Sequence, residues 1–243
     1  MDDGAPLLAA AREALGAAYL RTGDYDGVAQ ILERALRVAE AEGDRKQEAA
    51  VLAQQGLLLH FRAIEVSPEE RAAVDPGPEQ ELFEQALAIR RELGDDEGIV
   101  ESLFHLGLVH QVLRRDLAAG APYFREALEL IHRLPDCDTW LHSEIHRHVG
   151  FDLLVRQERY DEALGQLSIS LELRNSLEEG GWAVGGLTAL SAAARLAGLR
   201  DVAIEYARRA LELARAEGLL ERHVTAARES VEAAEQMPEE PPS

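Results

Sequence analysis

Hydrophobic residues recur with helical spacing along nearly the whole chain. Leu32, Ala35, Leu36 and Ala39 follow the order i, i+3, i+4, i+7, which places them on one face of a helix. The segments 82–89 and 124–131 carry apolar residues on a similar face. No stretch of useful length shows the strict alternation expected of a β-strand. The pattern therefore predicts an all-α protein.

This helical pattern repeats along the chain. Ala-Leu pairs begin at Ala35, Ala86, Ala127 and Ala210, and Ser170-Leu171 takes the fourth place, so that the successive steps are 51, 41, 43 and 40 residues. A second set of small residues precedes them, consisting of Gly16, Gly56, Gly107, Gly150 and Ser191. Internal similarity at this period indicates a stack of helical units, each packing on its neighbours.

Glycine and aspartate mark the expected helix ends, as in Gly43-Asp44 and Gly94-Asp95. Glycine suits the left-handed position after a helix, and the following aspartate can cap the next one. These breaks predict five helix pairs and an unpaired last helix with a polar outer face. The expected ranges are 7–22 and 25–42, 45–65 and 78–93, 96–114 and 117–133, 138–157 and 160–178, 181–197 and 200–217, and 219–236. A repeat domain would then span 7–236, between a tail over 1–6 and a disordered tail over 237–243.

The second unit is about ten residues longer than the others, with the extra residues near 65–77. Ser67-Pro68-Glu69-Glu70 combines an N-cap, a proline at the first helical position and a capping box, so a short helix is expected there. Asp75-Pro76-Gly77-Pro78 predicts a turn before the next helix. We interpret the extra residues as a surface loop, because such insertions cost little stability, in preference to a flap with a function.

The local motifs resemble the tetratricopeptide repeat (TPR). Leu15-Gly16-x-x-Tyr19, followed by Gly23-Asp24-Tyr25 and Ala35, is similar to its signature, and Leu106-Gly107 with Phe124-x-x-Ala127 gives a third-unit match. The resemblance covers about residues 7–217, and the period is closer to the longer variety of about 40–42 residues. HEAT and armadillo repeats share that period but lack the L-G-x-x-Y pattern, so they rank second.

The resemblance implies a right-handed α-solenoid of about five helix pairs with a C-terminal capping helix. The first helix of each pair would line a concave groove that binds a peptide or a partner helix. Carried onto this sequence, the groove residues are His60, Phe61, Phe104, Leu108, Gln111, Val112, Arg147, Phe151, Leu154, Val155 and Arg195. The competing interpretation is that these residues pack against the next helix, because the units are longer than the 34-residue template.

The charge narrows the range of partners. The chain has 45 acidic and 25 basic residues, a formal net charge of −20, which disfavours nucleic acid and anionic membranes. No apolar run is long enough to span a bilayer.

The cysteine content bears on the cellular location. The single cysteine, Cys137, excludes an intramolecular disulfide, so a cytoplasmic protein is expected.

Candidate chemistry is sparse. His142 and His146 are four residues apart on a predicted helix and so share a face, but no third ligand is evident, and partly exposed histidines are favoured over a metal site. Cys137 lies between acidic residues that would raise the pKa of its thiol, which argues against a reactive thiolate. We therefore expect no catalytic residue, metal or cofactor.

The sequence thus favours a non-enzymatic interaction module, an adaptor that binds a peptide or amphipathic helix of a protein partner in its groove. Two alternatives stay open. One is a small-molecule binding protein or unusual enzyme with an apolar pocket in the same groove, and the other is a self-associating scaffold such as a homodimer. The partner itself is not indicated.

Overall fold

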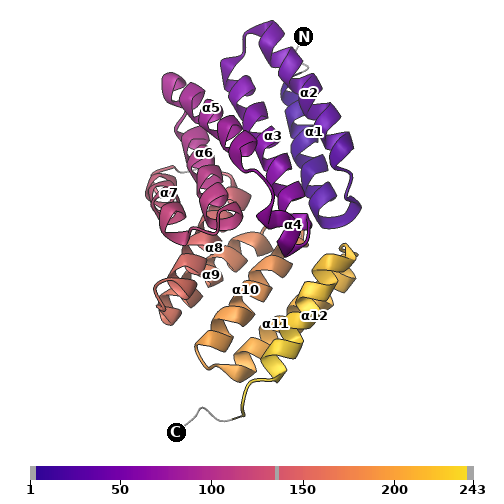
Figure 1. Ribbon diagram of the computed structural model, residues 1–243, viewed down its shortest axis with the longest axis vertical. Helices are drawn as coiled ribbons and strands as arrows, with labels where there is room; N and C mark the ends of the chain where they lie inside the picture. Colours follow the sequence, from indigo (N-terminus) through magenta and orange to yellow (C-terminus); the bar gives the residue numbers. More distant parts are fainter. Residues whose placement is uncertain (1–3, 135–136, 240–243) are drawn as a thin grey trace. The chain divides into compact units, whose positions relative to one another are not determined.

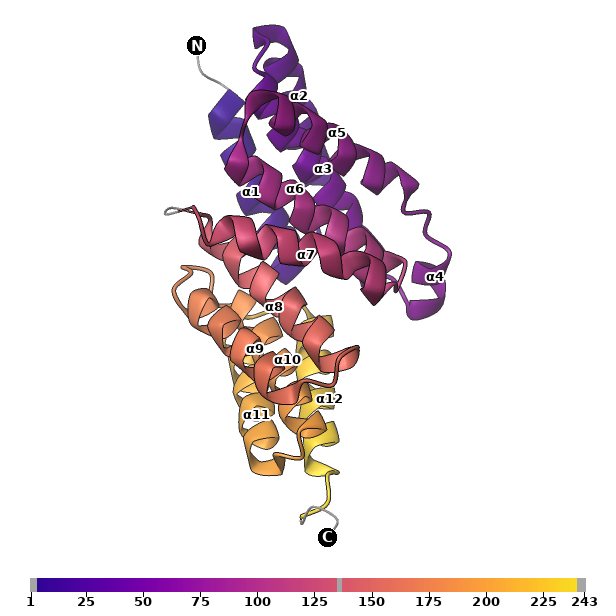
Figure 2. The same cartoon turned by 90° about the vertical axis from the view of Figure 1, so that its left-hand side faces the viewer.

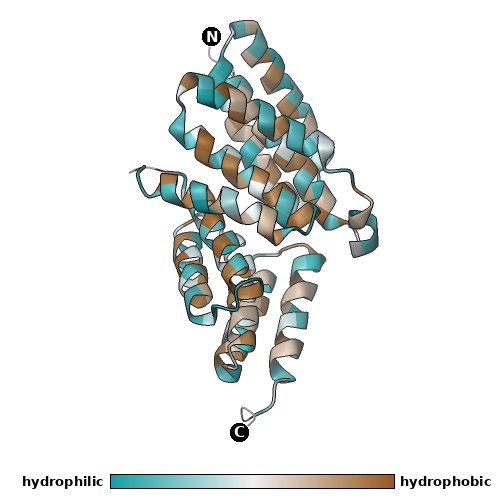
Figure 3. Cartoon of the chain, turned by 60° about the vertical axis from the view of Figure 1, so that its left-hand side comes forward, coloured by the Kyte–Doolittle hydropathy of each residue, from teal (hydrophilic) through white to brown (hydrophobic). Residues whose placement is uncertain are grey.

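The computed structural model describes residues 4–134 and 137–239, and the regular structure in this part of the chain is helical. Ten of its twelve α-helices pack in five consecutive pairs, which confirms the all-α solenoid class. Hydrophobic and hydrophilic residues are interspersed along the helices, as expected of amphipathic helices that each bury one face (Figure 3). The chain divides into two compact units, residues 1–135 and 136–243, and each is described by itself.

Unit 1 contains three helix pairs (Figure 1). In the first, α1 (Gly4–Ala17) runs on through a π-helical turn (Ala18–Thr22) and packs on α2 (Tyr25–Glu42). In the second, α3 (Arg45–Glu65) packs on α5 (Gly77–Leu93). The third pair is α6 (Asp96–Leu108), extended by a π-helical turn (Val109–Leu113), and α7 (Leu117–Ile131).

Unit 2 contains two further pairs and a last helix. The pairs are α8 (Thr139–Val155) with α9 (Tyr160–Asn175), and α10 (Trp182–Leu196) with α11 (Arg200–Ala216). The last helix, α12 (Glu221–Glu235), packs on both α11 and α10. Among the described residues, no helix combines the length and apolar character that crossing a bilayer requires.

The small residues of the first helices explain why the pairs pack closely. A Cβ atom added at Gly56 would lie 2.4 Å from the Phe83 ring, and one at Gly107 would lie 2.6 Å from the Phe124 ring. Phe83 and Phe124 each precede the alanine of an Ala-Leu pair by three residues. In the fifth repeat, the hydroxyl of Ser191 donates to the carbonyl of Ala203 at 2.9 Å. Gly56, Gly107 and Ser191 therefore let the second helix of their pairs approach closely.

The turns follow the expected glycine and aspartate chemistry. Gly43 has a φ of +68°, and the side chain of Asp44 accepts a hydrogen bond from the backbone N–H of Gln47 at 2.9 Å. Gly94 has a φ of +66°, but Asp95 makes no side-chain cap hydrogen bond and instead forms an ion pair with Lys46 at 3.1 Å. Glycine therefore ends both α2 and α5. The aspartate that follows caps α3 but does not cap α6.

The insertion in the second repeat forms the short helix α4 (Pro68–Ala72). Ser67 accepts a hydrogen bond from the backbone N–H of Glu70 at 3.2 Å, and Glu70 accepts one from the backbone N–H of Ser67 at 3.0 Å, which is the predicted capping box. Figure 2 shows α4 at the tip of the connection between α3 and α5.

Three features differ from the predicted organisation. First, the described chain has two compact units where the sequence suggested one domain over 7–236. Second, α1 begins at Gly4, inside the expected tail. Third, Met237, placed in a disordered tail, packs against a cluster that includes Ala203, Ala207 and Ala234. Residues 1–3 and 240–243 lie outside the described residues, and the right-handed superhelix stays a prediction.

Candidate functional site

In unit 1, the predicted groove residues are mostly part of the core. His60, Phe61, Phe104, Leu108 and Gln111 are buried, and Val112 is partly buried. Phe61 stacks on Tyr19 with 4.5 Å between ring centroids, and Phe104 packs against Phe124 of α7 at 6.0 Å. Nδ1 of His60 lies 2.9 Å from Oε1 of Glu79. In this unit the structure matches the alternative interpretation, in which neighbouring helices cover these side chains.

In unit 2, the predicted positions divide into two groups. Leu154 is buried, and Arg147 and Arg195 are partly buried. Phe151 and Val155 on α8 are 43% and 46% exposed. Leu196 on α10 is 51% exposed, and it follows Ser191 by the same five residues that separate Val155 from Gly150. Val155 and Leu196 therefore occupy the same position in their repeats. The helices that carry them, α8 and α10, contact each other. Phe151, Val155 and Leu196 are called the exposed apolar positions below.

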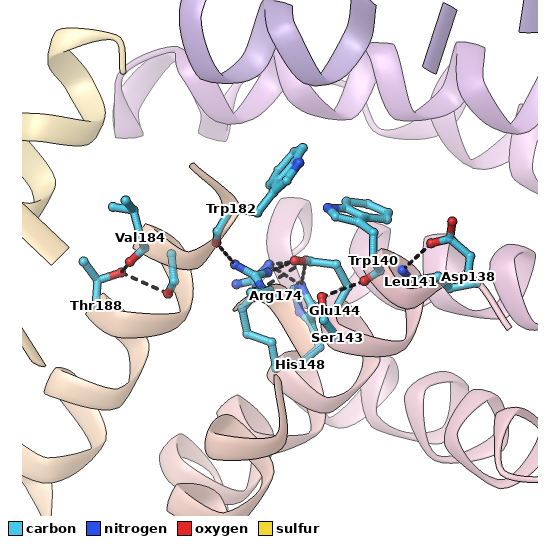
Figure 4. A network of polar contacts seen from close by, with 12 residues as sticks. Asp138, Trp140, Leu141, Ser143, Glu144, His148, Arg174, Trp182, Val184 and Thr188 are labelled. Atoms are coloured by element: carbon cyan, nitrogen blue, oxygen red, sulfur yellow. Dashed lines mark hydrogen bonds and ion pairs between the residues drawn. The ribbon is translucent and has the colours of Figure 1, made fainter. Parts of the chain in front are cut away.

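A buried charged cluster underlies this part of unit 2 (Figure 4). Glu144 of α8 forms an ion pair with Arg174 of α9, and both side chains are buried. Nη1 of Arg174 also donates to the carbonyl oxygen of Trp182 at the start of α10, at 2.5 Å. One arginine therefore ties together α8, α9 and α10.

The same carboxylate positions a cation beside the exposed apolar positions. Nη2 of Arg147 donates to Glu144 at 2.7 Å and to Nε2 of His148 at 2.8 Å. Arg147 precedes Phe151 by four residues, so the two side chains lie on the same face of α8. We call Glu144, Arg147, His148 and Arg174 the Glu144 network. The network holds a guanidinium at one end of the apolar face of α8.

Unit 1 has a comparable cluster around Glu101, which precedes Gly107 by six residues as Glu144 precedes Gly150. Glu101 pairs with Arg90, accepts from Gln54 at 3.3 Å, and lies 3.5 Å from Arg12. Burial acts to raise the pKa of this carboxyl, but Arg90 and the other neighbouring positive charges outweigh it and lower the pKa to about 2. Glu101 is therefore ionised and bound within unit 1.

His105 lies within reach of this cluster. Its ring is fully buried and stacks on Phe83 at 4.6 Å, and neither ring nitrogen has a hydrogen-bond partner. Burial lowers the pKa of His105 to about 3, so the ring is neutral at physiological pH. We therefore expect this buried, neutral imidazole to affect the stability of the fold and not to act in catalysis.

Sequence reasoning missed the two buried arginines. Arg90 and Arg174 each follow the small residue of the Ala-Leu or Ser-Leu pair by four positions, at Ala86 and Ser170. That spacing places them on the core face of the second helix of their pair. The available signal was an arginine on the face of a helix that is otherwise apolar. A guanidinium buried there needs an anionic partner, which would have pointed to a buried ion pair.

A shallow depression on unit 2 lies at α11 and α12 instead of at the predicted groove. Its lining is largely charged, with Arg200, Arg208 and Arg209 opposite acidic residues that include Glu235. Arg208 pairs with Glu235 at 2.7 Å, and Arg200 donates to the carbonyl of Met237 at 3.0 Å. None of the predicted groove residues lines this depression.

Comparison with known proteins supports the repeat assignment. A sequence model described as tetratricopeptide repeat matches residues 11–46, which span the second half of α1, the π-helical turn after it and all of α2. This chain carries a tetratricopeptide repeat. None of the curated proteins matches the sequence.

The structure is also similar to the one described as the crystal structure of BtubC (BKLC) from P. vanneervenii. The two chains are 18% identical, with a TM-score of 0.50 over 89% of this chain and 92% of that chain. At this identity, the likeness shows a shared fold. The assignment of a tetratricopeptide repeat is thus supported by a sequence comparison, and that of a helical-repeat fold by a separate structural one.

Proposed function

We propose that this protein is a non-enzymatic interaction module that binds a peptide or an amphipathic helix of a protein partner through unit 2. Tetratricopeptide repeats generally mediate protein interactions. The observation that carries the proposal is the exposure of Phe151 and Val155 at predicted groove positions of α8, together with that of Leu196 at the related position of α10. The corresponding proposal for unit 1 has less support, because its large apolar groove residues are buried.

The energetics suit a reversible complex. Burying a large apolar side chain completely contributes about 1.5–3 kcal/mol, so side chains that are already half covered offer about half of that each. Association and ordering of the partner offset part of this gain. Three such positions therefore support a modest affinity, to which backbone and polar contacts would add.

The charges at the site favour carboxylates at the edges of the bound segment. Arg147 is held beside Phe151 by the Glu144 network, and Arg195 directly precedes Leu196. In the described part of unit 2, Arg195 makes no ion pair. A partner helix with apolar residues on one face and acidic residues beside them matches this arrangement.

The test is capture of partners from lysate of the cells that produce the protein, with two variants. Phe151→Glu combined with Val155→Glu places charges at the proposed surface. Ile169→Glu is the matched control, since Ile169 is also exposed, at 39%, but lies on the second helix α9. Circular dichroism checks that both variants keep their helices.

The proposal expects a polypeptide that the wild-type chain and the Ile169 variant retain and that the double variant loses at least tenfold. Equal retention by all three proteins would contradict it, because the exposed apolar positions would then play no part in binding.

A further inference from the structure

Two histidines of α8 lie close together at their ring nitrogens. Nε2 of His142 and Nε2 of His146 are 3.2 Å apart, and the ring centroids are 5.0 Å apart. Their spacing of four residues puts both rings on one face of the helix. His146 is buried, whereas His142 is partly exposed. The pair is thus open to solvent on the His142 side.

Gln166 of α9 orients the second ring. Nδ1 of His146 lies 2.6 Å from Oε1 of Gln166, so Nδ1 carries the proton and donates it to the amide oxygen. In the neutral ring the lone pair is then on Nε2, the atom that faces His142. Metal-binding histidines are commonly held in this way, with the other ring nitrogen donating to a polar group outside the ligand set.

The nitrogen separation fits a shared metal ion. Zinc–nitrogen bonds of about 2.0–2.1 Å at a tetrahedral angle place two ligand nitrogens about 3.3 Å apart. The observed 3.2 Å is close to that value. A direct N–H···N hydrogen bond between the rings has a similar length, so the two arrangements must be separated by experiment.

We propose that His142 and His146 bind a divalent transition-metal ion through their Nε2 atoms, with Gln166 positioning His146. Imidazole ligands suit Zn²⁺, Ni²⁺ and Cu²⁺ over Ca²⁺ or Mg²⁺, which prefer oxygen. Two protein ligands leave coordination positions for water or for another donor group. The site uses none of the exposed apolar positions and does not depend on the function proposed above.

The test uses the full chain after treatment with a chelator. Zn²⁺ is titrated by calorimetry near pH 7.5, and Co²⁺ is titrated by visible absorption, which reports nitrogen coordination. The expected result is one saturable equivalent per chain. His142→Ala removes this equivalent, and because the residue is partly exposed, the helices are expected to persist by circular dichroism.

Two further variants sharpen the result. Gln166→Leu keeps both ligands but removes the orienting hydrogen bond, so affinity should fall about ten- to a hundredfold. His110→Ala is the control, because His110 lies in unit 1, where it stacks on Tyr123, and its loss should leave the titration unchanged. Absence of a saturable equivalent, or equal binding by the His142 variant, would overturn the proposal in favour of a metal-free hydrogen bond.

Discussion

At the scale of single residues, a small residue in the first helix limits how closely a helix pair can pack. Gly107 illustrates this, because an added Cβ would lie 2.6 Å from the Phe124 ring, a separation that requires the ring to move. Phe124 is itself buried, so it has little room to do so. The glycine is therefore required by packing and not by its backbone angles.

Gly107→Ala is expected to destabilise the protein by about 1–3 kcal/mol, the usual cost of overpacking a core. Gly165→Ala on α9 is the matched control, since nothing lies within 4 Å of its added Cβ. There the methyl group should be neutral or stabilising by up to about 1 kcal/mol, as alanine favours helix. Urea denaturation measures both, and equal effects would contradict the packing role.

His105 makes a residue-level prediction about pH. Its pKa is about 3 in the folded protein, below the ordinary value of 6.5, because its ring is buried. Between these values the unfolded chain binds a proton that the folded chain does not. Titration of His105 therefore leaves the free energy of unfolding unchanged above about pH 6.5. Below that pH it lowers the free energy of unfolding, by at most about 1.4 kcal/mol per pH unit for one proton.

His105→Leu should flatten the dependence of the free energy of unfolding on pH between 6.5 and 4.5. This window lies above the range in which Glu101 contributes, because its pKa is lowered from 4.5 to about 2 and its stabilisation is lost only as the pH falls through that interval. Denaturation at several pH values gives the slope. An unchanged slope in the variant would show that His105 is not the group that takes up the proton.

At the scale of helices, buried charge pairs join elements that are separate in the sequence. Arg174 links α8 to α10 through Glu144 and the Trp182 carbonyl. Removing one partner of a buried pair leaves the other charge unpaired in the core, at a cost of about 3–5 kcal/mol. Such pairs fix which helices meet.

Arg174→Met is therefore expected to lower the free energy of unfolding by about 3–5 kcal/mol. Arg159→Met is the control, because Arg159 pairs with Glu162 at the surface and such pairs contribute about 0–1 kcal/mol. Combining Arg174→Met with Glu144→Met should recover much of the loss. No recovery in the double variant would show that the two charges act independently.

Helix identity and helix ends were largely predictable from the sequence, and residue burial was less so. The predicted range 25–42 and the observed α2 coincide, because Asp24 and Gly43 provide a cap and a left-handed stop. The burial of Phe104 was not predictable, since spacing identifies the face of a helix but not whether another helix covers it. The pairing of Glu144 with Arg174 depends likewise on how three helices meet.

At the scale of the whole molecule, repetition predicted the class of fold, and the division into two compact units was not visible in the sequence. The repeat motifs continue from the third to the fourth unit at a similar step of 43 residues, so nothing in their spacing marks a boundary. The candidate surface could be predicted in part. Phe151 and Val155 are exposed at predicted groove positions, whereas Leu154 beside them is buried.

The central claim is that the exposed apolar positions of α8 and α10 contact a protein partner. The most direct measurement places a photo-crosslinking amino acid at position 151, or at position 169 as the control, and irradiates the cells that produce the protein. The account predicts a defined polypeptide adduct from position 151 and none from position 169. Adducts of equal yield from both positions, or no adduct from position 151, would contradict it.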